Sequence, residues 1–209
     1  MSRLFDISPA ISPRLPVWPG DTPPSPEVLL DMPRGDPPTL STLRTPVHAA
    51  PPADAPSHYG REAPTIEAAD LSAYLGTCVV VRVDARPATR IGPAALPADL
   101  RAERVLLATG TFPDPERFDA RFAALDPALV DWLADRGTRL VGVDTPSVDL
   151  FDDAALLAHG RCLARGVAIL EGLVLDKVPA GCYELIALPL KLEGFDASPV
   201  RAVLRQLPR

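Results

Sequence analysis

The stretch Cys78-Val79-Val80-Val81-Arg82-Val83 decides the fold class. Its residues are mostly β-branched and nearly all apolar, which is typical of a strand that is buried on both faces of a sheet. Three short apolar runs farther along the chain predict more buried strands, at residues 104–109, 140–143 and 167–170. Weaker strand patterns occur earlier, at residues 3–7, 28–32 and 40–47.

Helix signals are confined mostly to the second half of the chain. Asp126 is a good N-cap and Pro127 suits a first turn, so a helix is expected from there. A second helix is expected to begin at Asp152 or Asp153 and to end before Gly166. The last two strands are predicted at residues 183–192 and 200–204. These patterns predict an α/β fold in which a mixed β-sheet is layered with a few helices.

Composition excludes several classes of function. The net charge of −6 argues against nucleic-acid binding, which needs basic patches. We expect no contact with membranes, because no apolar run has the length of a membrane span or the pattern of a signal peptide. The three cysteines lack CxxC spacing, which favours a reducing compartment. The sequence therefore predicts a cytoplasmic protein.

A second stretch carries the chemistry: His48, Asp54 and His58 lie within eleven proline-rich residues. His159 is expected on the second helix and Glu171 at the end of the next strand, from where both can converge on one point. Imidazoles combined with carboxylates suit Zn²⁺ or Mn²⁺ better than Mg²⁺. Spacing alone leaves the alternative that these groups are unrelated surface residues. Among other site types, neither a nucleophile elbow nor a glycine-rich phosphate loop is present in the sequence.

Trp18 stands in the rigid, proline-rich segment Val17-Trp18-Pro19-Gly20-Asp21. Proline fixes the backbone around it, so the indole is held in one place. From the residues alone, packing in the core is favoured over contact with a ligand.

These residues together resemble the bacterial kynurenine formamidases of the cyclase family, metal-dependent amidohydrolases with the motif HxGxHxDxPxH. The resemblance runs from end to end, which implies one domain over residues 1–209. Beside the motif and the Trp18 segment, it rests on the segments at 141–147 (VGVDTPS), 168–175 (AILEGLVL), 184–191 (ELIALPLK) and 198–205 (SPVRAVLR).

The resemblance implies a swivelling β/β/α fold, a homodimer, and hydrolysis of N-formyl-L-kynurenine to L-kynurenine and formate in tryptophan breakdown. By position, His48 and Asp54 match ligands of a first zinc ion. Asp54 also matches the bridge to a second zinc, whose other ligands match His159 and Glu171. His58 matches the general acid/base, and Trp18 matches the aromatic residue of the substrate pocket.

The chain departs from the motif at two positions. Ala50 stands at the glycine, and Pro52 stands at the second histidine, where proline has no ligand atom. The first zinc would keep two protein ligands, His48 and Asp54, which is fewer than the three of a typical catalytic zinc. We therefore expect one zinc or two, and three functions stay open. They are an active formamidase, an inactive relative that serves in binding or assembly, and a hydrolase of another cyclic or aryl amide.

Overall fold

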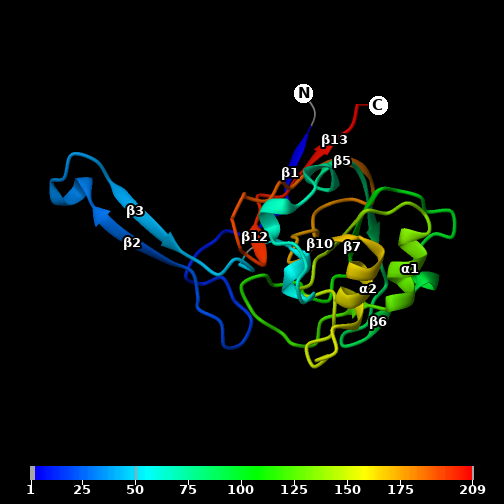
Figure 1. The fold of residues 1–209 in the computed structure, drawn as a ribbon. Coiled ribbons are helices and arrows are strands. Elements are labelled where there is room, and N and C mark those ends of the chain that lie inside the picture. The colour runs from blue at the N-terminus through cyan, green and yellow to red at the C-terminus, as the bar shows by residue number, and fades with distance from the viewer. Residues whose placement is uncertain (1–2, 50, 209) are drawn as a thin grey trace.

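The computed structural model describes residues 3–49 and 51–208, and a nine-stranded mixed sheet forms its centre (Figure 1). From one edge to the other, the strands are β1 (Leu4–Asp6), β13 (Val203–Gln206), β11 (Gly181–Ile186), β5 (Leu75–Arg82), β7 (Arg104–Ala108), β9 (Leu140–Val143), β10 (Ala168–Leu170), β4 (Pro52–Asp54) and β12 (Ala197–Pro199). The four strands from β5 to β10 are parallel, and the strands on either side of them are antiparallel to their neighbours. The predicted buried strands thus form the middle of the sheet.

Alternate residues of the central strands face two separate hydrophobic cores. In β7, Leu106 and Ala108 belong to one core, whereas Val105 and Leu107 belong to the other. This is the period of two that a strand imposes on its side chains. Helices α1 (Pro127–Ala134) and α2 (Leu157–Arg165) contact each other and cover the second core. The structure confirms the predicted mixed sheet with a few helices.

A long hairpin projects from the body of the molecule (Figure 1). It consists of β2 (Ser25–Leu30) and β3 (Leu40–Arg44), which pair antiparallel, and nearly all of its residues are exposed. A second small sheet pairs β6 (Arg90–Ile91) with β8 (Ala124–Leu125) in parallel. Among the helices in the described ranges, none is long and apolar enough to cross a bilayer.

Three local predictions were wrong. The strand predicted at 183–192 ends as β11 at Ile186, three residues before Pro189, because proline cannot continue the hydrogen-bond ladder. The strand predicted at 200–204 is instead β13, at 203–206, and β12 precedes it at 197–199. Helix α2 begins only after Leu156. The expected cap Asp153 accepts the N–H of Leu157 at 3.4 Å, and Asp149 accepts the next two, those of Ala158 and His159.

Candidate active site

Asp54 is the buried centre of the candidate site. Strand β4 lies inside the sheet between β10 and β12, so the carboxylate of Asp54 is almost fully enclosed. Its Oδ1 lies 3.3 Å from His48 Nδ1, and its Oδ2 lies 3.4 Å from His159 Nε2. Within the described residues, neither oxygen has a hydrogen-bond partner, and neither has His159 Nε2. Buried polar atoms are almost always paired, so three orphaned atoms at one point indicate a missing ligand.

His159 and Glu171 complete this group from α2 and from the end of β10. His159 Nε2 lies 3.3 Å from Glu171 Oε1, which also accepts the backbone N–H of Val148 at 2.7 Å. Bonds of about 2.0–2.1 Å to a tetrahedral zinc place two ligand atoms on the order of 3.4 Å apart. The two spacings from His159 Nε2 match that value, and the donors are one imidazole and two carboxylates. His159 is therefore placed to share a zinc-like cation with either carboxylate.

The outer nitrogen of His159 is held by a second carboxylate. His159 Nδ1 lies 2.8 Å from Asp149 Oδ2, and an ionised carboxylate only accepts, so Nδ1 carries the hydrogen. Burial opposes a charge on this ring, but the neighbouring carboxylates of Asp149, Asp54 and Glu171 outweigh it and raise the pKa of His159 to about 12. The surrounding carboxylates thus strongly favour a positive charge at this point, either a proton or a metal ion.

Burial and the negative charge of Asp54 raise the pKa of Glu171. The pKa of Asp54 moves the other way: burial alone would raise it, but His159 and His48 lower it well below its usual range. The two carboxylates therefore repel each other across the point where His159 Nε2 is aimed. A cation there would relieve that repulsion.

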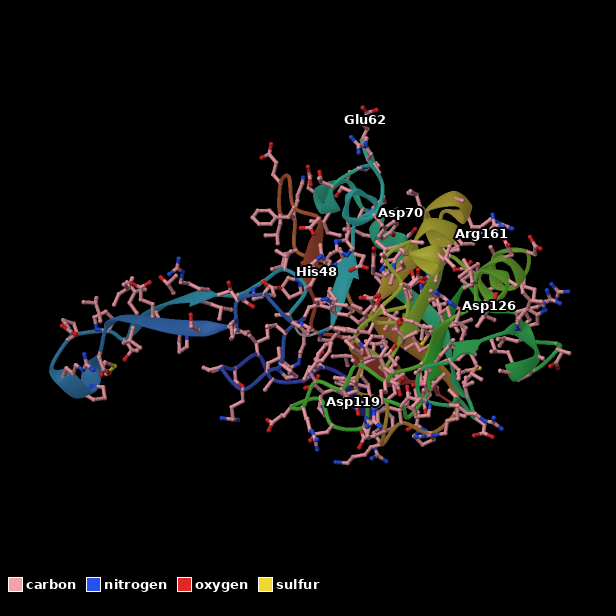
Figure 2. The ribbon with its side chains drawn as sticks, turned by 90° about the horizontal axis from the view of Figure 1, so that it is seen from below. His48, Glu62, Asp70, Asp119, Asp126 and Arg161 are labelled. Carbon is pink, nitrogen blue, oxygen red and sulfur yellow. The ribbon has the colours of Figure 1, made fainter. Side chains whose placement is uncertain are left out.

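His48 lies on the opposite side of Asp54. Figure 2 shows it where the projecting hairpin joins the body of the molecule. Its Nε2 lies 3.0 Å from Asp196 Oδ2. Burial acts against charging of the ring, but Asp54 and Asp196 outweigh it and raise the pKa of His48 to about 9.

Pro52 fits the strand that carries Asp54. Val200 donates its N–H to Pro51 O at 3.0 Å, and Glu171 donates to Pro52 O at 3.2 Å, so these carbonyls take part in the sheet. The ring of Pro52 lines the same pocket as His48, His58 and Glu171. The proline therefore removes a side-chain ligand without separating His48 from Asp54. Ala50, the other departure from the motif, lies outside the described residues.

The pocket in front of these groups has a volume of about 820 Å³. Its lining includes Trp18, Phe112 and Phe118. Trp18 packs on Phe151 with 5.0 Å between ring centroids and an angle of 32°, and it stays 40% exposed. The indole is thus held by aromatic neighbours at the pocket wall and is not part of the closed core, contrary to the expectation from the residues alone.

His58 follows Asp54 on the single 3-10 turn Pro56–His58. It also lines the pocket, and one of its ring nitrogens lies within 4.8 Å of ligand atoms of Asp54 and His159. A second group with the same spacing joins His58 to His48 and Asp196. The structure therefore brings together His48, Asp54, His58, His159 and Glu171, the residues singled out in the sequence.

Comparison with known proteins identifies the family. The family model for Cyclase, described as "Putative cyclase", matches residues 5–150. The chain belongs to the cyclase family. A structure described as a "potential metal-dependent hydrolase with cyclase activity" is 26% identical, has a TM-score of 0.85, and is covered 100% in both chains. A "predicted metal-dependent hydrolase from Bacillus stearothermophilus" is 27% identical with a TM-score of 0.83 and 98% coverage of both chains.

An isatin hydrolase bound to the product analogue thioisatinate shares the fold at 17% identity, with a TM-score of 0.85, over 100% of this chain and 93% of that one. The comparisons thus support a metal-dependent hydrolase of the cyclase family.

In this cyclase-family chain, sequence reasoning missed two carboxylates, Asp149 and Asp196. Each binds the outer nitrogen of a histidine, His159 or His48. Asp149 follows the DTPS segment by two residues, and Asp196 stands two residues before Ser198, where the last matched segment begins. The position of each aspartate beside a matched segment was therefore a signal in the sequence. Neither aspartate was connected with its histidine, because the two are not neighbours along the chain.

Proposed function

We propose that this protein is a metal-dependent arylformamidase, which hydrolyses N-formyl-L-kynurenine to L-kynurenine and formate. The observation that carries the proposal is that His159 Nε2 lies 3.4 Å from Asp54 Oδ2 and 3.3 Å from Glu171 Oε1, while neither carboxylate oxygen of Asp54 nor His159 Nε2 has a hydrogen-bond partner among the described residues. The choice of substrate rests on the sequence resemblance over the whole chain.

Zinc is the metal that we propose for this position. Asp54, His159 and Glu171 give the three protein ligands of a catalytic zinc, which leave one position open. His48 and Asp54 alone would hold a first zinc weakly, because Pro52 contributes no atom. When bound, zinc supplies Lewis acidity that lowers the pKa of water and polarises a carbonyl group.

His58 is the general acid/base of the proposed reaction. Water adds to the formyl carbon, and the bond between that carbon and the aryl nitrogen then breaks. His58 takes the proton that the water loses and returns it to the departing nitrogen, so that formate and the aryl amine leave. Its place on the turn directly after Asp54 puts the imidazole at the pocket and within reach of both proton transfers.

Trp18 binds the aromatic ring of the substrate in this proposal. It is 40% exposed at the pocket and is fixed from behind by Phe151 and Phe118. Aromatic pairs favour offset-stacked or edge-to-face contacts, both of which a half-exposed indole offers. The pocket volume of about 820 Å³ is within the range usual for small-molecule sites.

The experiment that tests the function is release of formate from N-formyl-L-kynurenine by protein supplied with zinc or manganese. Turnover supports the proposal, and no turnover with excess of either metal overturns it. Isatin, a cyclic aryl amide, serves as the second substrate. Turnover of isatin alone would make the protein a hydrolase of a different amide.

A second candidate function follows from Pro52. A relative that has lost metal binding would act in binding or assembly and not in catalysis. Purified protein that holds no zinc after reloading favours this function, whereas tightly held zinc favours the hydrolase.

We also propose a cytoplasmic homodimer. The hairpin of β2 and β3 projects into solvent and exposes Val28, Leu29, Met32, Leu40 and Leu43. An isolated two-stranded hairpin is marginally stable, so it needs a surface to pack on. A second copy of this chain is the partner that the sequence resemblance implies.

A further inference from the structure

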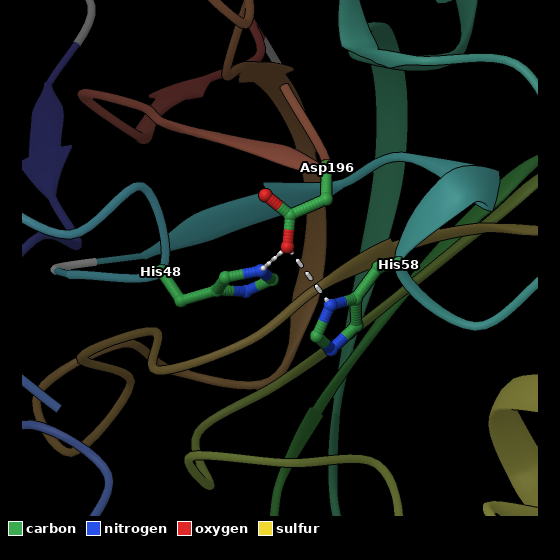
Figure 3. A group of neighbouring side chains, drawn as sticks. All are labelled: His48, His58 and Asp196. Carbon is green, nitrogen blue, oxygen red and sulfur yellow. Dashed lines mark hydrogen bonds and ion pairs between the residues drawn. The ribbon is translucent and has the colours of Figure 1, made fainter. Parts of the chain in front are cut away.

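One carboxylate oxygen joins the two histidines of the loop. Asp196 Oδ2 lies 3.0 Å from His48 Nε2 and 3.2 Å from His58 Nδ1, as the dashed lines in Figure 3 show. The two rings lie with centroids 4.1 Å apart. Because an ionised carboxylate only accepts, both of these ring nitrogens carry hydrogens when they bond to Asp196.

The backbone holds Asp196 in register with the loop. Ala55 donates its N–H to Asp196 O at 2.9 Å, and Ala55 O accepts the N–H of His58 at 3.0 Å. The next residue, Ala197, pairs with Asp54 across β12 and β4. One residue, Ala55, therefore fixes both Asp196 and His58, and the sheet fixes both of them relative to Asp54.

The contact with Asp196 determines which nitrogen of His58 is available. With Nδ1 bound to Asp196, the other ring nitrogen, Nε2, points away from that carboxylate (Figure 3). A neutral imidazole with hydrogen on Nδ1 has its lone pair on Nε2. A proton acceptor at the pocket needs that tautomer, because only an unprotonated nitrogen can take a proton from water.

We propose that Asp196 is a positioning residue that sets the tautomer and orientation of His58 and, through the same oxygen, holds His48 beside Asp54. This inference rests on the proposed role of His58 in the hydrolase. Asp196 acts through the two imidazoles and takes no proton itself. Pro52 removes one ligand of the first zinc, of which His48 would be another ligand. The contact with Asp196 holds His48 in place whether or not that zinc is bound.

The test compares Asp196→Asn with Glu193→Gln, a matched control that removes an exposed carboxylate three residues earlier. Asn keeps the size of the side chain but presents an amide to two N–H donors. We expect a kcat for N-formyl-L-kynurenine about 10- to 100-fold lower in Asp196→Asn, the usual effect of losing a carboxylate behind a site histidine. KM and zinc content should change little, and Glu193→Gln should behave as the wild type.

Nitrogen-15 NMR of the imidazoles gives a readout that does not depend on activity. The resonances should show His58 with hydrogen on Nδ1 in the wild type and a mixture of tautomers in Asp196→Asn. An unchanged tautomer, or a hydrogen on Nε2 in the wild type, overturns the proposal, and so does loss of zinc in Asp196→Asn, which would show that Asp196 acts on metal binding and not on His58. If the NMR result holds while the wild type cleaves no formamide, the positioning role stands and the proposed function fails.

Discussion

Asp54 Oδ2 and His159 Nε2 lie 3.4 Å apart, and neither atom has a hydrogen-bond partner in the described part of the chain. A buried carboxylate without a partner costs free energy. The same two residues belong to strand β4 and helix α2, which are about a hundred residues apart in the chain. The fold thus brings two metal-ligand types together at a point where no protein group satisfies them.

Replacing His58 by Ala should abolish hydrolysis and leave the metal bound. Loss of a general acid/base typically lowers the rate by about 10²–10⁴-fold. Formate release and elemental analysis of the same preparation check both halves of the expectation. A His58→Ala protein without metal would show that His58 is a ligand and not the proton carrier.

Asp149 is expected to set the strength of metal binding through His159. Asp149→Asn removes the charge that holds His159 Nδ1 at 2.8 Å, and loss of such a partner typically weakens metal affinity about 10- to 100-fold. Titration with zinc in competition with a chelating dye measures the change. Asp152→Asn, at an exposed position nearby, is the control and should bind as the wild type does. Equal affinity in both variants would exclude this role for Asp149.

Trp18→Ala should raise KM by about 2- to 10-fold, since an aromatic pair contributes about 0.5–1.5 kcal/mol beyond its area. The other tryptophan, Trp132, lies on α1, where Arg136 covers its ring. Trp132→Phe is therefore the control and should leave KM unchanged. An unchanged KM in Trp18→Ala would place the substrate ring elsewhere in the pocket.

A histidine at position 52 should increase the amount of bound zinc. In β4, residues 52 and 54 are two apart, so a side chain at 52 points to the same face as Asp54. With Gly at position 50 as in the family motif, the double variant Ala50→Gly/Pro52→His restores the third ligand of the first zinc. Elemental analysis should find more zinc per chain than in the control Ala50→Gly/Pro52→Ala. Equal zinc in both would show that the loop is not the limiting defect.

The hairpin predicts how the proposed dimer breaks. Val28 and Leu43 lie on one face of the hairpin, because Pro26 pairs with Leu43 and side chains alternate along each strand. Val28→Glu/Leu43→Glu places two charges on that face and should convert the dimer to a monomer in sedimentation equilibrium. Leu190→Glu, an exposed leucine outside the hairpin, should leave the dimer intact. A double variant that stays dimeric would place the interface elsewhere.

Much of the fold followed from local patterns. Buried runs such as Cys78–Val83 identified the central strands, and Asp126 with Pro127 located α1, where Asp126 accepts the N–H of Ala128. These signals are read from neighbouring residues. The end of β11 at Ile186 was missed because an apolar run continues beyond it to Pro189, although the chain leaves the sheet.

The sequence predicted only part of the candidate site, because local patterns do not show which distant residues meet in the fold. The histidines stood out because the chain has three of them. Asp149 and Asp196 did not, since aspartates are common and their partners lie 10 and 138 or more residues away. The role of Asp196 depends on the register of β12 with β4 and on the turn at Ala55, and that of Asp149 depends on the position of α2, which only the folded chain shows.

Elemental analysis of the purified protein, made beside an assay of N-formyl-L-kynurenine hydrolysis, tests the central claim most directly. The proposed ligand set of Asp54, His159 and Glu171 predicts about one tightly held zinc per chain and formate release that a chelator removes and zinc restores. Protein that holds no zinc after reloading and releases no formate would contradict it.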